Sequence, residues 1–135
     1  MTPETMLDSL TTWAARDDRV LALALVGSHA RGEARPDSDL DLIVISGVPD
    51  DLLGDPSWTA VFGAVESSAH EDYGLVTSVR VRYEGGEEVE FGITTPEWTA
   101  LPLDPGTRRV LEDGARVLYD EEGLLTRAID ALPLS

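Results

Sequence analysis

VGSHARGEARPDSDLDL, residues 26–42, is the stretch that decides the fold of this chain. It starts at the end of an apolar run, Val20–Val26, which predicts a central strand covered on both faces. Gly27 and Ser28 follow at once, and a second strand-like run covers Leu40–Ile45. The stretch therefore predicts two buried strands joined by a glycine-led turn and a short helical segment.

The turn itself carries a candidate anion site. Gly27 lets the backbone approach a bulky anion closely, and the free N–H groups of the following helical turn favour phosphate. Ser28 adds a hydroxyl donor, and Arg31 adds a positive charge one turn later. We therefore take Gly27, Ser28 and Arg31 as candidate phosphate-binding residues.

Two aspartates open the second strand. Asp39 and Asp41 are two residues apart, so their side chains project from the same face, while Leu40 and Leu42 point into the core. Two adjacent carboxylates repel each other, and a hard cation such as Mg²⁺ or Mn²⁺ relieves that repulsion through oxygen ligation. The alternative is an exposed strand with two solvated aspartates. The glycine–serine turn that precedes the pair favours the metal site.

The motif Gly-Ser-His-Ala-Arg-Gly (27–32) followed by Asp-Ser-Asp-Leu-Asp-Leu (37–42) resembles the signature of the polymerase-β-type nucleotidyltransferase superfamily. It is similar to that of small bacterial nucleotidyltransferase-domain proteins. The resemblance implies that the glycine–serine turn holds a nucleoside triphosphate, and that Asp39 and Asp41 bind two divalent ions. Ser38 is placed in the same nucleotide-binding set, where it caps or orients the strand entrance.

The resemblance also implies a third carboxylate on a later strand. The candidates are Glu87, Glu88 and Glu90. Alternation along residues 88–93 buries Val89, Phe91 and Ile93, which leaves Glu90 in mid-strand on the other face beside Gly92. We assign Glu90 as the third catalytic and metal-binding carboxylate. The alternative is that Glu90 belongs to the polar outer face of an amphipathic hairpin.

The whole chain, residues 1–135, is expected to form one nucleotidyltransferase domain of the α/β (α+β) class. It would be a two-layer fold with a mixed sheet and helices packed on one face. Helices are expected after Thr2-Pro3, ending near Arg16, after Asp55-Pro56, and from Leu124, with a short turn at Thr95-Pro96. Further strands are expected at Leu75–Tyr83, Glu87–Ile93 and Ala115–Tyr119.

Other residues receive less specific predictions. Trp13, Trp58 and Trp98 are expected to pack in the core, and His70 to lie in a solvated acidic loop. Arg80 and Arg82 alternate on one strand. They are expected either to contact phosphate or to form salt bridges with acidic side chains.

Composition limits the classes of partner. The formal net charge of −16 argues against non-specific binding to nucleic acid or anionic membrane. Cysteine is absent, which excludes disulfides and thiolate metal sites. Without a secretory signal or an apolar run long enough to span a bilayer, the chain is expected to be cytoplasmic.

The leading expectation is a metal-dependent enzyme that transfers AMP from ATP to a hydroxyl acceptor and releases pyrophosphate. The alternatives are a minimal nucleotidyltransferase antitoxin acting on a helical toxin partner, and a non-catalytic nucleotide-binding domain. One helix is expected after Tyr119, so the chain resembles a catalytic core without the helical domain of larger relatives. A small molecule in the open cleft, a homodimer partner or a second protein would then provide the acceptor.

Overall fold

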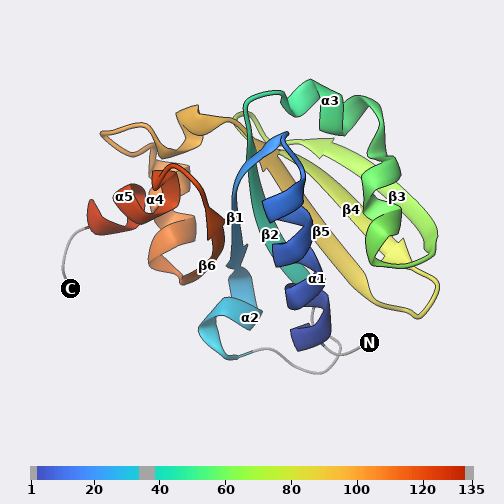
Figure 1. Cartoon of the computed structure of the whole chain (residues 1–135). Coiled ribbons are helices and arrows are strands. Elements are labelled where there is room, and N and C mark those ends of the chain that lie inside the picture. Colours follow the sequence, from blue (N-terminus) through green and yellow to red (C-terminus); the bar gives the residue numbers. More distant parts are fainter. Residues whose placement is uncertain (1–2, 34–38, 133–135) are drawn as a thin grey trace.

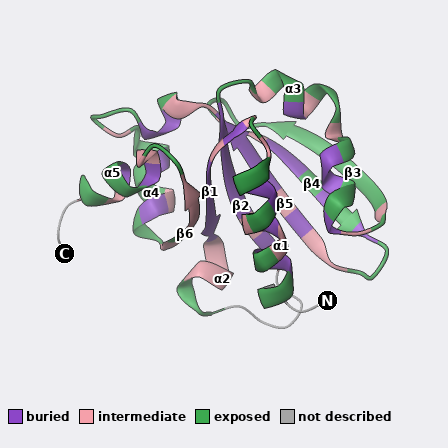
Figure 2. Ribbon diagram, in the orientation of Figure 1, coloured by how far each residue is buried: buried purple, intermediate pink, exposed green. Residues whose placement is uncertain are grey.

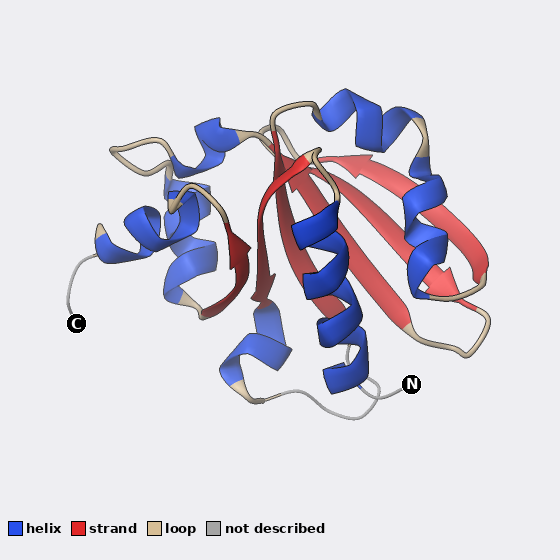
Figure 3. Cartoon of the chain, viewed as in Figure 1, coloured by secondary structure: helices blue, strands red, loops and turns tan. Residues whose placement is uncertain are grey.

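The computed structural model describes residues 3–33 and 39–132. Figures 1 and 3 show helices placed around one twisted sheet. The elements along the chain are α1 (Pro3–Arg16), β1 (Val20–Val26), α2 (Gly27–Arg31), β2 (Leu40–Ser46), α3 (Pro49–Gly54), the 3₁₀ helix η1 (Pro56–Phe62), β3 (Val65–Asp72), β4 (Thr77–Tyr83), β5 (Glu88–Thr94), the 3₁₀ helix η2 (Pro96–Thr99), α4 (Pro105–Glu112), β6 (Ala115–Asp120) and α5 (Leu124–Asp130).

The strands of the described residues form a six-stranded sheet in the order β3-β4-β5-β2-β1-β6. β2 and β5 run parallel, whereas the β1–β2, β1–β6, β3–β4 and β4–β5 pairs are antiparallel. The predicted mixed sheet is therefore confirmed. The two strands that carry the predicted carboxylates are neighbours at its centre, although they are far apart in the sequence.

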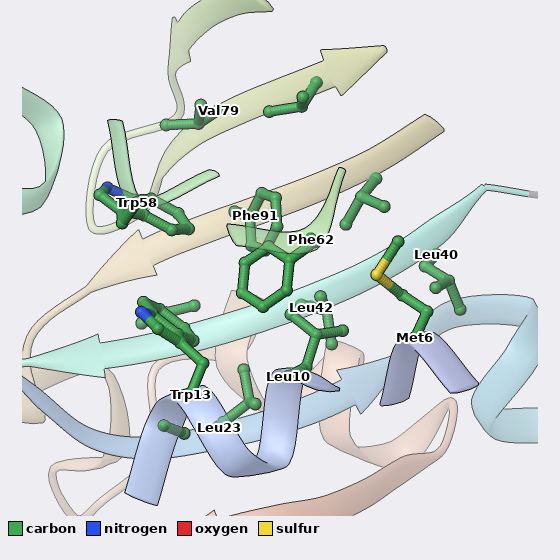
Figure 4. Close-up of a cluster of buried hydrophobic side chains, with 14 of the residues drawn as sticks. Met6, Leu10, Trp13, Leu23, Leu40, Leu42, Trp58, Phe62, Val79 and Phe91 are labelled. Carbon is green, nitrogen blue, oxygen red and sulfur yellow. The ribbon is translucent and has the colours of Figure 1, made fainter. Parts of the chain in front are cut away.

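One face of the sheet carries the larger apolar cluster, beneath α1, α3 and η1. Trp13 of α1 stacks on Trp58 of η1 with ring centroids 5.0 Å apart, and Trp58 meets Phe91 of β5 edge to face. Figure 4 shows Trp13, Trp58 and Phe91 in this cluster together with Leu42 and Leu23 of the sheet. Burying an aromatic ring of this size stabilises a fold by about 1.5–3 kcal/mol, so the rings fix α1 and η1 on the sheet. This cluster is the helix layer that the sequence predicts.

The structure adds a second, smaller cluster on the other face. Ile43 and Ile45 of β2 pack there with Trp98 of η2, Leu111 of α4 and Leu125 of α5. This cluster lies toward the β1 and β6 side of the sheet, where Figure 2 shows buried positions on α4 and α5. All three tryptophans are buried, as predicted. The second cluster matters for the site described below because Asp41 projects from this same face of β2, two residues before Ile43.

The sequence did not predict α3, α4 or β3. On α4 only Thr107 and Leu111 are buried, which is too few to produce a helical apolar pattern. β3 is an edge strand whose residues are exposed except for the half-buried Val65, so it shows no apolar alternation. The prediction of a loop around His70 is wrong, because His70 lies on β3. No helix of the described residues is long and apolar enough to cross a membrane.

Candidate active site

The junction of β1 and α2 brings the backbone of Gly27 against a carboxylate. Gly27 has a φ of 76°, a left-handed conformation that favours glycine. A Cβ at this position would lie 2.5 Å from Oδ2 of Asp41 and 3.3 Å from its Cβ. Val26, one residue earlier, is the cross-strand partner of Asp41. The close approach that the sequence predicts at Gly27 is thus made in this structure by Asp41.

Asp39 and Asp41 lie as the strand pattern predicts. Asp41 is on β2 and Asp39 immediately precedes it, and both are half-buried. Leu40 and Leu42 are buried in the larger cluster on the opposite face. The two aspartates therefore share the face that carries the smaller cluster.

β5 places a second pair of carboxylates beside the aspartates. In the parallel register Asp41 is opposite Glu90, and Val89 and Phe91 are buried on the far face. The carboxyl groups of Asp41 and Glu90 lie close enough to affect each other's protonation, and so do those of Asp39 and Glu88. Glu87 lies before β5, beside the turn. Of the three glutamates, Glu90 is the one brought next to Asp41.

The proximity of these carboxylates changes their protonation. Burial, together with the negative charges of Glu90 and Asp39, raises the pKa of Asp41 to about 6. Burial also raises the pKa of Asp39, and the negative charge of Glu88 adds to the rise. A carboxylate cluster of this kind is stabilised by a cation, because a cation relieves the repulsion between the charged forms.

Side chains of β4 hold both glutamates. Ser78 Oγ donates to Oε1 of Glu90 at 2.8 Å, and Arg80 Nη2 pairs with Oε2 at 3.1 Å. Arg82 Nε donates to Oε1 of Glu88 at 3.0 Å. Arg80 and Arg82 were expected either to contact phosphate or to form salt bridges, and in the structure both form salt bridges. Sequence reasoning missed Ser78, although the register of the hairpin around 84–86 places it near Glu90.

A cleft of about 280 Å³ opens over these residues. Its walls come from β1, β2, β4, β5, α2, α4 and the β3–β4 turn. The lining residues are Val26, Gly27, Arg31, Asp41, Leu42, Ile43, Tyr73, Val76, Ser78, Glu90, Gly92, Val110 and Asp113. A second groove of about 510 Å³ shares Ile43, Tyr73, Val76 and Val110 with it and continues toward Trp98 and Leu75. The two hollows therefore adjoin at an apolar boundary.

The other predicted nucleotide-binding residues lie around the cleft at different distances. Arg31 lines it and packs near Gly114, where a Cβ would lie 3.1 Å from Arg31 Cγ. Its Nε also donates to Glu33 at 3.3 Å. Ser28 is half-buried on α2 beside Gly27, and neither Ser28 nor Asp39 is among the described residues that line the cleft. Ser38 lies outside the described residues.

The donor set suits a hard cation, because it consists of carboxylate oxygens on two adjacent strands. Within residues 3–33 and 39–132, however, no three His, Asp or Glu side chains are grouped as metal ligands. Asp41 and Glu90 are adjacent, but Asp39 interacts with Glu88, and both oxygens of Glu90 have partners on β4. The roles of Gly27, Ser28, Arg31, Asp39, Asp41 and Glu90 stay predictions.

The fold of this chain is similar to part of a larger solved structure, and weaker matches were found to two others. An aminoglycoside 6-adenyltransferase from Bacillus subtilis matches with a TM-score of 0.57 and 14% identity over 70% of this chain. Cid1 in complex with a UTP analogue matches with a TM-score of 0.48 and 18% identity over 67%. The polymerase core of the RNA surveillance complex TRAMP gives 0.46 and 16% over 66%. These matches cover 35%, 28% and 28% of the respective chains, so this chain spans about a third of their length.

Sequence comparison identifies the family. No curated protein matches the chain significantly. The nucleotidyltransferase domain family, however, matches residues 10–131, a span that runs from within α1 to just past α5 and includes each predicted site residue. The predicted polymerase-β-type fold and the predicted class of enzyme are thereby confirmed: the chain belongs to the nucleotidyltransferase domain family.

Proposed function

We propose that this domain transfers AMP from ATP to a hydroxyl acceptor, with release of pyrophosphate, in a reaction that depends on Mg²⁺ or Mn²⁺. The observation that carries the proposal is the pairing of Asp41 with Glu90 across β2 and β5, directly beside the Gly27 turn. This arrangement joins a carboxylate pair to a glycine-led helical turn in a single cleft. Membership of the family supplies the class of reaction.

The triphosphate would lie at the Gly27 end of the cleft. Gly27 and Arg31 both line the cleft, and Ser28 stands between them on α2. Backbone N–H groups and a guanidinium are ordinary partners of phosphate oxygens. A chain with a net charge of −16 repels a polyanion at long range, so local positive charge at this end is needed for binding. Ser38 is the remaining candidate for this set.

Asp39, Asp41 and Glu90 would hold the divalent ions. Their oxygens are the type of ligand that Mg²⁺ and Mn²⁺ prefer, and burial beside the negative charges of Glu90 and Asp39 raises the pKa of Asp41. When bound, such ions screen the phosphates and stabilise charge on the attacking and leaving oxygens.

In the reaction, the acceptor oxygen forms a bond to the α-phosphorus of ATP. The bond between that phosphorus and the oxygen bridging to the β-phosphorus breaks, and pyrophosphate leaves with the bonding electrons. The proton of the acceptor hydroxyl passes to Glu90, which lies at the cleft beside Asp41. The residues of the cleft contribute chiefly by positioning and by electrostatic stabilisation, as in phosphoryl transfer generally.

A small-molecule acceptor is the simplest partner for this cleft. The adjoining groove, bounded by Trp98, Leu75 and Val110, gives space beyond the carboxylates for a second substrate or for the nucleoside. A helical protein partner remains the alternative acceptor. A panel of hydroxylated small molecules and the products of neighbouring reading frames, each tested with radiolabelled ATP, would separate these two cases by which component becomes labelled.

The decisive experiment measures ATP binding by isothermal titration with Mg²⁺ present. We expect binding by the wild-type protein and its loss in the double variant Asp39→Asn/Asp41→Asn, because the metals that bridge protein and triphosphate lose their ligands. Thermal melts in EDTA serve as the control for folding. Equal ATP affinity in the two proteins would refute the metal-dependent site.

A further inference from the structure

Two arginine–glutamate pairs stand next to each other where β4 meets β5. The antiparallel register sets Arg80 opposite Glu90 and Arg82 opposite Glu88. Arg80 Nη2 lies 3.1 Å from Oε2 of Glu90, and Arg82 Nε lies 3.0 Å from Oε1 of Glu88. The two pairs have the same chemistry and similar exposure, with 55% of the Arg80 side chain and 53% of the Arg82 side chain accessible.

The environment of the two glutamates is different. Glu90 lines the cleft beside Asp41, and its other oxygen accepts the hydroxyl of Ser78 at 2.8 Å. Both oxygens of Glu90 are therefore bonded to β4. Glu88, by contrast, lies beside Asp39 and does not line the described cleft. A cation that binds Oε2 of Glu90 must therefore compete with the guanidinium of Arg80, which already pairs with that oxygen.

The charge of Arg80 also reaches both aspartates. Burial and neighbouring carboxylates raise the pKa of Asp39 and Asp41, and Arg80 opposes this rise at each of them. Three carboxylates on adjacent strands need positive charge nearby to remain ionised together. Arg80 supplies such charge from β4.

We propose that Arg80 is a built-in counter-ion of the metal site, which holds Glu90 in the metal-free protein and yields Oε2 of Glu90 to a divalent cation. The inference rests on the proposed function, because it takes Glu90 as a metal ligand. Arg80 is then a positioning residue that competes with the metal, and the affinity of the site for its cation is lower than the three carboxylates alone would give.

The test is a titration with Mn²⁺ alone, followed by the loss of the EPR signal of free Mn²⁺. We expect Arg80→Gln to bind Mn²⁺ about threefold more tightly than wild type, the size expected for removing one partly screened charge. Arg80→Lys keeps the charge and should stay within about 1.5-fold of wild type, which separates charge from side-chain packing. Arg82→Gln is the matched control and should also change the affinity by less than about 1.5-fold, because its partner lies outside the cleft.

Each outcome decides between explanations. Unchanged or weaker Mn²⁺ binding by Arg80→Gln overturns the proposal, and weaker binding would mean that Arg80 orients Glu90 for the metal. An equal gain in Arg82→Gln also overturns it, because the effect would then be general surface charge. If the wild-type protein does not bind Mn²⁺, or if Asp41→Asn binds it equally well, the metal site of the proposed function is refuted. This inference then fails with it. Far-UV circular dichroism checks that each variant is folded.

Discussion

Two rows of charged side chains lie side by side across β4, β5 and the beginning of β2. The inner row consists of Asp41, Glu90 and Arg80, and the outer row of Asp39, Glu88 and Arg82. The order of residue types is the same in both: aspartate, glutamate, arginine. Only the inner row has a glutamate in the cleft, with Gly27 against its aspartate and Ser78 bonded to its glutamate. The comparison teaches that the surroundings, rather than the residue types, distinguish a candidate active site from a surface charge ladder.

The difference shows in the aspartates. Burial, with Glu90 and Asp39 adding to it, brings the pKa of Asp41 to about 6, whereas Asp39 is raised less. Burial raises the pKa because it disfavours the charged form. When equivalent residues of the two rows are compared, substitution of the more buried one should therefore have the larger effect. Three pairs of variants can break or sharpen this comparison.

The largest effect is expected from the two glutamates. Glu90→Gln should reduce pyrophosphate release by on the order of 100-fold or more while ATP binding is largely retained, because it removes a ligand and proton acceptor that act in the transition state. Glu88→Gln should stay close to wild type. Both rates are measured with a coupled pyrophosphate assay in Mg²⁺. A large loss in Glu88→Gln with a normal Glu90→Gln would reverse our assignment of the third carboxylate.

The two glycines around α2 give the next effect. Gly27 and Gly32 have φ values of 76° and 73°, so alanine is strained to a similar extent at each, by about 1–2 kcal/mol. Only at Gly27 would the new Cβ strike Asp41, whereas nothing lies within 4 Å at Gly32. We expect Gly27→Ala to lower turnover by about 10- to 100-fold through displacement of Asp41, and Gly32→Ala to leave it unchanged. Both rates are corrected for the folded fraction from urea unfolding, and equal losses would argue against a special role for Gly27.

The smallest effect concerns stability and pH in the metal-free protein. Because the pKa of Asp41 is raised to about 6, the folded state favours its protonated form. Its contribution to stability is then full below pH 4 and is lost as the pH rises through 6. Asparagine does not ionise, so Asp41→Asn does not have this loss. Between pH 4 and pH 7 its free energy of unfolding should rise by about 1–2 kcal/mol relative to that of wild type, allowing for partial solvent screening.

Urea unfolding in EDTA at several pH values measures this gain. Asp39→Asn should change in the same direction by less, because Asp39 is less enclosed and its pKa is raised less. A pH-independent difference between Asp41→Asn and wild type would contradict the enclosed position of Asp41.

Residues that face the core could be predicted well from the sequence. Leu40 and Leu42 alternate with the aspartates, and Val89, Phe91 and Ile93 alternate with Glu88 and Glu90, so both strands and the face of their acidic residues follow from a period of two. β3 could not be found in this way, because its residues are mostly exposed and it has no buried face to leave a pattern.

The contacts of the site were harder to predict than its acidic residues. The pairing of Asp41 with Glu90 depends on the parallel register of β2 and β5, which no local pattern specifies. The ion pair between Arg80 and Glu90 depends on the register of the β4–β5 hairpin, so the sequence alone does not identify the partner of Arg80. The approach of Asp41 to Gly27 has the same origin, because the sequence shows that something must come close to this glycine but does not show what.

The parallel pairing of β2 with β5 also has a consequence for the order in which the molecule can assemble. Asp41 and Glu90 are about fifty residues apart in the sequence, and contacts at such separations form slowly because a long loop must close first. During synthesis, β1 and β2 can pair as soon as they emerge, whereas the carboxylate pair must wait for the β4–β5 hairpin. A truncated chain that ends before β5 would keep the glycine–serine turn and both aspartates, yet it could not complete the cleft.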